Sequence, residues 1–198
     1  MLRIAEESDI PEILGIYGPY ILTSTATFEY TVPSQEEFIQ RFRGITARFP
    51  WLIFEEDGVI LGYAYASAPF SRAAYDWCAE PSVYLRPEAR GRGIGRALYG
   101  ALEQILRYQG FQLLYALVTG ENSASIAFHH ALGYETLAVF PDCGFKFGRW
   151  LSLDWLQKRL TPVEIPSRTP MSWSEICQDA QKFSDILGTL SLSETGKI

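Results

Sequence analysis

Apolar positions along this chain follow two spacings, which predict alternating helices and strands. Apolar residues three or four positions apart predict helices from Ser8 to Ile21, from Ser34 to Ile45, from the glycines at 93 and 95 to about Gln109, and over Asn122–Leu132. Alternating or continuous apolar runs predict strands over Leu2–Ala5, Trp51–Glu55, Val59–Ala66, Trp77–Leu85, Leu113–Val118, Tyr134–Phe140 and Lys146–Leu153.

Local start and turn signals support several of these boundaries. Ser34 and Glu37 form the Ser-x-x-Glu capping box that opens a helix. Asp9 precedes a proline in the first turn of the earlier helix. Asp57-Gly58 predicts a tight hairpin between the second and third strands. Two longer loops are expected, over Thr23–Val32 and Ser67–Tyr75.

The order of the elements predicts the fold class. Leu113–Val118 is apolar throughout, which predicts a strand buried on both faces. Helices separate some strands, whereas hairpins join others. This mixture predicts an α/β (α+β) fold in which a mixed central sheet packs between helices, rather than a purely doubly wound sheet.

The character of the chain changes after Leu160. Thr161–Pro170 contains three prolines and is expected to be a linker. A second capping box, Ser172-x-x-Glu175, predicts a last helix with an apolar stripe at Ile176, Ala180, Phe183, Leu187 and Leu190. Such a stripe binds a partner or docks on its own domain, and docking is the commoner use. The sequence thus predicts a domain over residues 1–160 and a linker with an amphipathic helix over 161–198.

Composition and charge narrow the classes of function. The chain has 198 residues, 47% of them hydrophobic, which is enough for a full core. Its net charge of -6 argues against a nucleic-acid partner. The three cysteines lack metal-ligand spacing, so we expect no metal and a reducing, cytoplasmic location. We expect no signal peptide and no membrane span, because the first residues are acidic and no apolar run approaches about 20 residues.

The most informative segment is the glycine-rich bend between the strand ending at Leu85 and the following helix. Gly91, Gly93 and Gly95 alternate where that helix must begin. Glycines let the backbone approach a ligand, and the first amides of a helix have no intrahelical partner. Together with the positive end of the helix dipole they form a phosphate or pyrophosphate site. Three arginines add positive charge there, at positions Arg90, Arg92 and Arg96.

Other anion-binding motifs fit this bend less well. A Walker A loop needs Gly-Lys-Ser/Thr after the glycines, whereas Arg96-Ala97 follows here. A dinucleotide fingerprint needs the spacing GxGxxG, which these glycines lack. A turn softened by glycines and flanked by surface arginines is the remaining alternative.

Three positions carry side chains that suit a catalytic or binding site. Glu80 stands on a strand among Trp77, Cys78, Ala79 and Pro81, where partial burial would raise its pKa and favour a general base; the alternative is a solvated edge glutamate. Only one of the adjacent His129 and His130 can face a site, since neighbours on a helix diverge by about 100°. Arg72 could bind a carboxylate with its two-pronged guanidinium or be a solvated loop arginine.

Several ordered motifs resemble one known family. The stretches TSTATFEYTVP, RAAYDWCAEPSVYLRPEARGRGIGRALY, ENSASIAFHHALGYE and GFKFGRW are similar to those of phosphinothricin N-acetyltransferases, within the GNAT superfamily. That family, related to the methionine sulfone and sulfoximine acetyltransferases, transfers acetyl from acetyl-CoA to the α-amine of glutamate-like amino acids. The resemblance covers about Leu2 to Leu160 and implies a GNAT fold.

The resemblance implies a role for each matching residue. The acetyl-CoA pyrophosphate would be held by Arg90, Gly91, Arg92, Gly93, Ile94, Gly95 and Arg96. The pantetheine arm would lie along Val83, Tyr84 and Leu85, and Asn122 with Ser125 would contact the far part of the cofactor. Glu80 would be the catalytic base and His129 would lie near the leaving sulfur. The substrate would be contacted by Phe28, Arg72, Tyr75 and Lys146.

One departure and several rival functions accompany the resemblance. The family often reads Lys-His-Gly where this chain has Lys146-Phe147-Gly148, and an apolar ring there is expected to alter the substrate pocket. The rivals are a GNAT enzyme acting on protein N-termini or polyamines, and a non-catalytic acyl-CoA sensor. The family also implies a homodimer, to which the aromatic residues of the C-terminal strand, Phe145, Phe147 and Trp150, could contribute surface.

Overall fold

Seven strands form a single mixed sheet in the computed structural model, which describes residues 1–163 and 165–179. The strand order is β1-β2-β3-β4-β5-β7-β6. Only β4 and β5 run parallel, and every other neighbouring pair is antiparallel. The strands are β1 Leu2–Ile4, β2 Trp51–Glu56, β3 Val59–Ser67, β4 Cys78–Leu85, β5 Leu113–Thr119, β6 Glu135–Lys146 and β7 Arg149–Arg159. The expected mixed sheet is confirmed.

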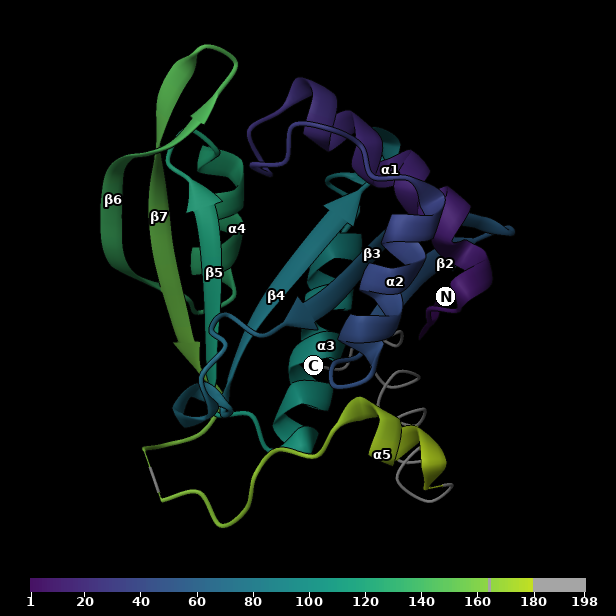
Figure 1. The fold of residues 1–198 in the computed structure, drawn as a ribbon, viewed down its shortest axis with the longest axis vertical. Coiled ribbons are helices and arrows are strands. Elements are labelled where there is room, and N and C mark those ends of the chain that lie inside the picture. The colour runs from purple at the N-terminus through teal and green to yellow at the C-terminus, as the bar shows by residue number, and fades with distance from the viewer. Residues whose placement is uncertain (164, 180–198) are drawn as a thin grey trace.

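Helices cover both faces of this sheet (Figure 1). The α-helices are α1 Ile10–Thr23, α2 Gln35–Thr46, α3 Ile94–Gln109, α4 Ser123–Ala131 and α5 Trp173–Gln178. Short 3₁₀ turns lie at η1 Glu7–Asp9, η2 Ala73–Tyr75 and η3 Pro87–Ala89. Helices α1 and α2 pack on one face through a cluster that includes Ile13, Phe38 and Trp51. Helix α3 packs on the opposite face through a second cluster that includes Leu98 and Leu102.

The start and turn signals read from the sequence are present. The Ser34 side chain accepts from the amide of Glu37, and the Glu37 carboxylate accepts from the amide of Ser34. Asp57 and Gly58 both have positive φ, at 51° and 76°, which is the geometry of a two-residue type I′ hairpin. These local signals hold because each satisfies backbone groups within a few residues.

Three strand predictions were wrong in part. Strand β6 does not end at Phe140 but continues to Lys146, and β7 runs from Arg149 to Arg159. An irregularity in the register between Phe140 and Gly144 lets β6 pass Pro141 without ending. Strand β5 is fully buried on one face only: Leu114, Ala116 and Val118 are buried, while the residues between them are half-buried. The second face is covered by the loop after β3, whose Phe70 ring contacts Tyr115.

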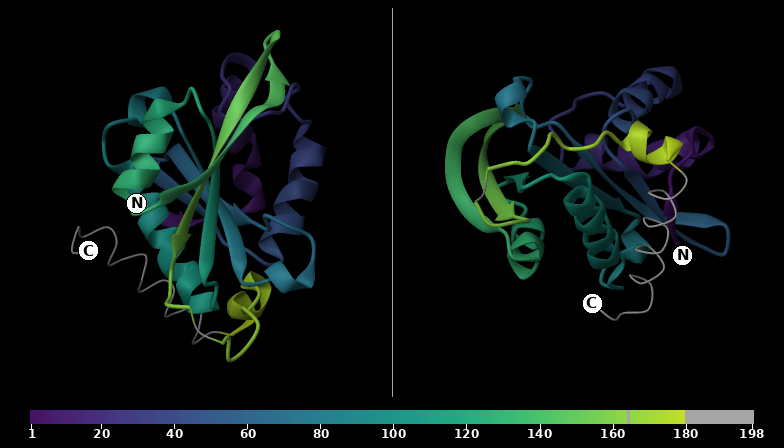
Figure 2. Two further views of the ribbon diagram at one scale, coloured as in Figure 1. Left: turned by 90° about the vertical axis from the view of Figure 1, so that its left-hand side faces the viewer. Right: turned by 90° about the horizontal axis from the view of Figure 1, so that it is seen from below.

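The described part of the segment after Leu160 docks on its own domain. Trp173 and Ile176 are buried in the same cluster as α3. The amide of Trp173 donates to the carbonyl of Arg48, and the amide of Met171 donates to that of Gln109. Helix α5 therefore lies beside the end of α2 (Figure 2). The rest of the predicted stripe, Ala180, Phe183, Leu187 and Leu190, lies outside the described residues.

We predict that this docking stabilises the whole domain. Trp173→Ala removes a large ring that is 3% exposed, so the free energy of unfolding should fall by about 3 kcal/mol. Urea denaturation would measure the change. Cys177→Ser, on the exposed side of the same helix, is the matched control. An unchanged midpoint in W173A would mean that α5 adds nothing to domain stability.

Candidate active site

The site begins where the sheet comes apart. β4 and β5 are paired only at Cys78 with Leu113 and Ala79 with Leu114, and beyond these residues the two strands diverge (Figure 1). Pro81 follows directly in β4. Proline has no N–H, so it cannot donate the hydrogen bond that would continue a ladder. The divergence opens a gap in the middle of the sheet.

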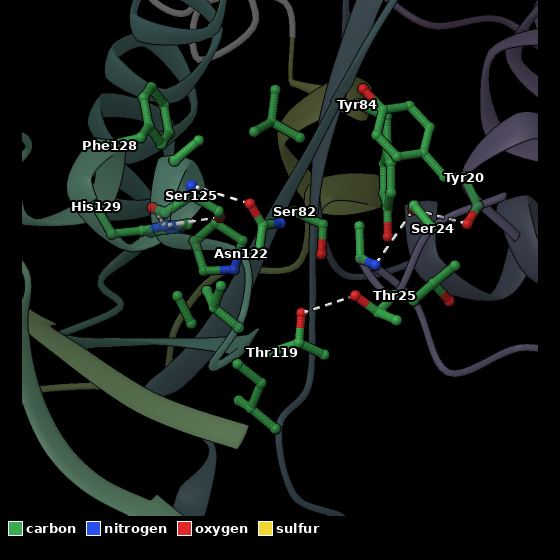
Figure 3. Close-up of a pocket in the computed structure, with 18 of the residues that line it drawn as sticks. Tyr20, Ser24, Thr25, Ser82, Tyr84, Thr119, Asn122, Ser125, Phe128 and His129 are labelled. Atoms are coloured by element: carbon green, nitrogen blue, oxygen red, sulfur yellow. Dashed lines mark hydrogen bonds between the residues drawn. The ribbon is translucent and has the colours of Figure 1, made fainter. Parts of the chain in front are cut away.

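A cavity of about 850 Å³ occupies this gap. One wall comes from α1 and the loop that follows it, and the opposite wall from β5 and α4 (Figure 3). Strand β4 and the start of the glycine bend line the space between them. The predicted site residues in its lining are Phe28, Glu80, Val83, Tyr84, Leu85, Arg90, Gly91, Asn122, Ser125 and His129.

The edge of β4 that faces the cavity carries backbone groups without a strand partner. Tyr20 Oη donates to the carbonyl of Leu85 at 2.7 Å and accepts from its amide at 3.2 Å. Because N–H and C=O alternate in direction along a strand, Val83 turns its amide and carbonyl to the same side as Leu85. The Pro81 carbonyl faces that side too and accepts from Tyr99 Oη at 3.0 Å. Val83 therefore offers a free strand edge to a ligand.

The glycine bend leads directly into α3. Gly91 and Gly93 have φ of 73° and 81°, a region that favours glycine. Gly95 does not, and a Cβ there would meet its neighbours at ordinary contact distances. Gly93 is the N-cap of α3, and it has no side chain that could accept a hydrogen bond from the first amides of the helix. The first amides of α3 thus stay available for an anion.

The three arginines of the bend have different surroundings. Arg90 lines the cavity, and its guanidinium lies over the Tyr20 ring and donates to Tyr20 Oη at 3.1 Å. Arg92 instead pairs with Glu56 on the surface at 2.8 Å. Arg96 is exposed. The cavity lining does not include Arg92, Gly93, Ile94, Gly95 or Arg96.

Helix α4 begins at the opposite wall. Asn122 is its N-cap, and Asn122 Oδ1 accepts from the amide of Ser125 at 3.1 Å (Figure 3). This bond uses the side-chain oxygen of Asn122, so its amide NH₂ group remains to donate elsewhere. Both residues line the cavity, where they could contact a cofactor.

Glu80 has the environment expected for a general base. Its carboxylate is half-buried in the cavity wall, and among the described residues no side chain forms an ion pair or hydrogen bond with it. Burial raises its pKa above the ordinary carboxyl value. A carboxylate with a raised pKa binds a proton more readily at neutral pH, which suits proton removal from an amine.

His129 faces the cavity and His130 does not. His129 is 4% exposed, and burial lowers its pKa. Its Nδ1 lies 2.7 Å from the carbonyl oxygen of Ser125, and its Nε2 lies 2.9 Å from Tyr99 Oη. His130 is exposed, and its Nδ1 lies 3.0 Å from the carbonyl oxygen of Tyr134. The 100° divergence of adjacent helix positions separates the two rings.

Three of the four predicted substrate residues lie away from the cavity lining. Phe28 does line it, and its ring packs so closely on Gly144 that a Cβ there would come within 2.4 Å. Arg72 and Tyr75 lie in the loop before β4, both exposed, and the Tyr75 ring contacts Phe70. Neither reaches the cavity in this structure.

Lys146 is a structural clamp. Its side chain is 2% exposed, and its ammonium donates to the carbonyls of Ser24 at 2.8 Å and Thr27 at 2.7 Å. It thereby ties the loop after α1 to the β6–β7 hairpin. Phe147 stands at the tip of that hairpin with φ of 51° and does not line the cavity. The expected effect of its apolar ring on the pocket is therefore not seen in this chain.

The sequence did not single out several residues of the cavity wall. Tyr17, Tyr20, Thr25 and Glu29 come from α1 and its loop, while Tyr99 comes from α3. The unusual run of threonines and aromatics over Thr23–Val32 was a signal for Thr25 and Glu29, whereas Tyr17 and Tyr20 lie before it in α1 and had none. Tyr99 had no such signal, because it occupies an ordinary position on the apolar face of a helix.

The described residues contain no cluster of three or more His, Cys, Asp or Glu side chains able to hold a metal ion. Within the same residues, no helix is both long and apolar enough to cross a membrane.

Comparison with known proteins gives one consistent family. Residues 2–155 match the model of the acetyltransferase (GNAT) domain. The chain is 38% identical to a phosphinothricin N-acetyltransferase of Alcaligenes faecalis, over 80% of this chain and 82% of that protein. It is 34% identical to an L-methionine sulfoximine/L-methionine sulfone acetyltransferase of Salmonella typhimurium, over 83% of this chain and 97% of that protein.

The fold comparison agrees. A crystal structure of a GNAT superfamily phosphinothricin acetyltransferase from Sinorhizobium meliloti, in complex with AcCoA, superposes with a TM-score of 0.83 at 38% identity, covering 87% of this chain and 97% of that one. The resemblance and the fold class inferred from the sequence are confirmed. With its split mixed sheet, its cavity and these relatives, the chain belongs to the GNAT family of acetyltransferases.

Proposed function

We propose that the chain acetylates the α-amine of a small amino acid resembling phosphinothricin or methionine sulfoximine, by direct attack on acetyl-CoA. As a GNAT acetyltransferase it is an acyltransferase with acetyl-CoA as co-substrate. One observation carries the proposal: the cavity through the sheet runs from Arg90 and Gly91, in the glycine bend before α3, to the half-buried carboxylate of Glu80, which has no side-chain partner among the described residues. The names of the relatives support the substrate class.

The residues present fit acetyl-CoA. The amides at the start of α3 and the guanidinium of Arg90 suit its pyrophosphate. The free edge of β4 at Val83 suits the amides of its pantetheine arm, which would add like a strand. Asn122 and Ser125 would contact it from α4. Arg92 is paired with Glu56, so Arg90 is our choice for the main cationic contact.

Glu80 would start the reaction. An amino acid arrives with a protonated amine, which has no lone pair for attack. Glu80 takes one proton, directly or through a water, and the freed amine attacks the thioester carbonyl. A backbone N–H of β4 would stabilise the oxyanion. We assign no acyl-enzyme intermediate, because the one cysteine near Glu80 in sequence, Cys78, has its thiol pKa raised by burial.

The substrate end of the cavity carries three carboxylates with different partners. Glu29 is paired with Arg41 and Glu121 with Arg149, whereas Glu80 is unpaired. Arg90 is the one Arg or Lys in the cavity lining, and it lies at the cofactor end. Arg72 remains our proposal for the partner of the substrate carboxylate, and reaching the cavity would require its loop to move. The cytoplasmic location stays a prediction from the cysteine pattern.

The proposed substrate class predicts a selective pattern of thiol release. Purified protein with acetyl-CoA should release CoA with phosphinothricin, methionine sulfoximine and methionine sulfone, but not with spermidine or a peptide N-terminus. In Arg72→Ala the KM for the amine should rise about tenfold or more, while the KM for acetyl-CoA stays unchanged. CoA release with spermidine or peptide alone would change the proposed substrate class. Binding of acetyl-CoA without CoA release on any of the amines would favour the non-catalytic sensor.

Glu80→Gln should lose about 100-fold or more in kcat and still bind acetyl-CoA. In the wild type, kcat should fall as pH falls through the raised pKa of Glu80, because a protonated carboxyl cannot accept the amine proton. E80Q should lack this limb. Glu36→Gln, exposed on α2, is the control, and calorimetric titration measures acetyl-CoA binding. Normal turnover in E80Q would remove Glu80 from the mechanism.

We propose a homodimer that covers the outer edge of the sheet. β6 is the edge strand, and its hairpin with β7 exposes Leu137, Val139, Phe140, Phe145, Phe147 and Trp150. Sedimentation should show a dimer for the wild type and a monomer for Trp150→Asp. Val59→Asp, at an exposed apolar position on another strand, should remain a dimer. A wild-type monomer, or a W150D dimer of unchanged affinity, would contradict the proposal.

A further inference from the structure

A chain of three hydrogen-bond contacts lies in the cavity wall. Tyr99 Oη lies 3.0 Å from the carbonyl oxygen of Pro81 and 2.9 Å from Nε2 of His129. Nδ1 of His129 lies 2.7 Å from the carbonyl oxygen of Ser125. Tyr99 and His129 both line the cavity, and they come from α3 and α4. The chain therefore links the two helices across the open part of the sheet.

Counting protons assigns the tautomer of His129. A carbonyl oxygen only accepts, so Nδ1 must carry a proton to bond the Ser125 carbonyl at 2.7 Å, which is its shorter contact; Ser125 Oγ lies 3.4 Å away. In the neutral ring Nε2 then has a lone pair, which can only accept from the Tyr99 hydroxyl. Burial lowers the pKa of His129 and so favours this neutral ring at rest.

The same count of protons allows a second hydrogen-bond arrangement, in which the His129 ring carries an extra proton. Tyr99 has one hydroxyl proton but two acceptors within reach, Pro81 O and His129 Nε2. If Nε2 gains a proton, it donates to Tyr99 Oη, and the Tyr99 proton turns to Pro81 O. Each of the three acceptors then has a donor. The pair can thus hold one extra proton without breaking its hydrogen bonds.

Packing fixes this geometry. The Tyr99 ring meets Phe128 and His129 edge to face, with centroids 5.3 Å apart in both pairs. Tyr134 packs edge to face on His129 at 5.2 Å. Both ring nitrogens of His129 are engaged by Tyr99 and Ser125, so the Tyr99 side chain, which also lines the cavity, is the member of the pair left to meet a reactant there.

We propose that Tyr99 is the catalytic hydroxyl that protonates the leaving sulfur, and that His129 is a positioning residue acting through it as a proton store. This inference rests on the proposed acetyl transfer. After the amine has attacked, its nitrogen carries one surplus proton, which passes to Tyr99 Oη as the Tyr99 proton moves to Nε2 of His129. The C–S bond then breaks and sulfur keeps the electron pair. Sulfur takes a proton from Tyr99 Oη, and the proton on Nε2 returns to that oxygen.

The protons balance over this step. Nitrogen loses one proton, sulfur gains one, and Tyr99 and His129 end as they began. The proton that Glu80 removes belongs to the earlier ammonium and leaves to solvent. Glu80 and the Tyr99–His129 pair therefore serve different proton transfers, one before the attack and one after it.

The tautomer can be tested without turnover. The chain has only two histidines, so ¹⁵N-histidine NMR of the full chain gives two ring systems, and His130→Gln identifies them. We expect the neutral His129 ring protonated at Nδ1, with an Nε2 resonance that shifts in Tyr99→Phe. Tyr108→Phe, on an outer face of the same helix, should leave it in place. A ring protonated at Nε2 at rest, or an Nε2 resonance unmoved in Y99F, would overturn the inference.

Kinetics test the catalytic role with the amine on which the wild type is most active. Y99F and His129→Gln should each lose about 100-fold in kcat with KM for acetyl-CoA unchanged. The double variant should lose no more than either alone, because the residues act as a unit. His130→Gln and Tyr108→Phe should match the wild type.

The outcomes separate the two proposals. Y99F turnover equal to the wild type, or multiplicative losses in the double variant, would overturn the relay and leave the acetyl transfer intact. Absence of wild-type turnover with every amine would remove the proposed function and the relay's catalytic role together, whatever the NMR shows. If Y99F fails to fold, as judged by thermal denaturation, His129→Gln carries the kinetic test.

Discussion

The interrupted pairing between β4 and β5 is the constraint on which the rest of the structure depends. Two residue pairs join these strands, and Pro81 then removes the donor that would extend the ladder. Every other neighbouring pair in the sheet continues further. The gap therefore forms at one place in the core, and it forms between strands that helices on both faces hold in position.

Opening a sheet leaves backbone groups that need partners, and side chains supply them here. Tyr20 satisfies both groups of Leu85, and Tyr99 Oη lies within hydrogen-bond distance, 3.0 Å, of the Pro81 carbonyl oxygen. Each tyrosine comes from a helix that packs on the sheet and projects its hydroxyl to the strand edge. The same hydroxyls then line the cavity. A buried backbone group without a partner is costly, so the open edge of β4 needs these hydroxyls. The same tyrosine side chains therefore stabilise the split sheet and form part of the site.

The carboxylates that line the cavity differ in the cationic partners that the fold gives them. Glu29 pairs with Arg41. Hydrogen bonds from Thr25 and Arg149 lower the pKa of Glu121, whereas Glu80 lies in a wall that offers it no cation and burial raises its pKa. Lys146 uses its charge on two backbone carbonyls and so fixes the loop that carries Phe28 and Glu29. Glu80 and Glu121, on one cavity, thus differ in their readiness to take a proton.

The sequence by itself predicted most of the elements, because capping, periodicity and the glycine bend act within a few residues. The fold family and the choice of Glu80, Asn122 and His129, which line the cavity with Arg90, came from the resemblance of its motifs to a known family. The sequence misplaced the β6–β7 boundary, where a long hairpin passes Pro141 through a register irregularity. It also expected Lys146 to face the substrate, although two distant carbonyls bury its ammonium. Tyr20 and Tyr99 gave no signal, since their roles arise only when helices meet the edge of a strand from elsewhere in the chain. The roles of Tyr20, Tyr99 and Lys146 depend on contacts between residues 18 to 122 positions apart in the sequence, so only the tertiary structure decides them.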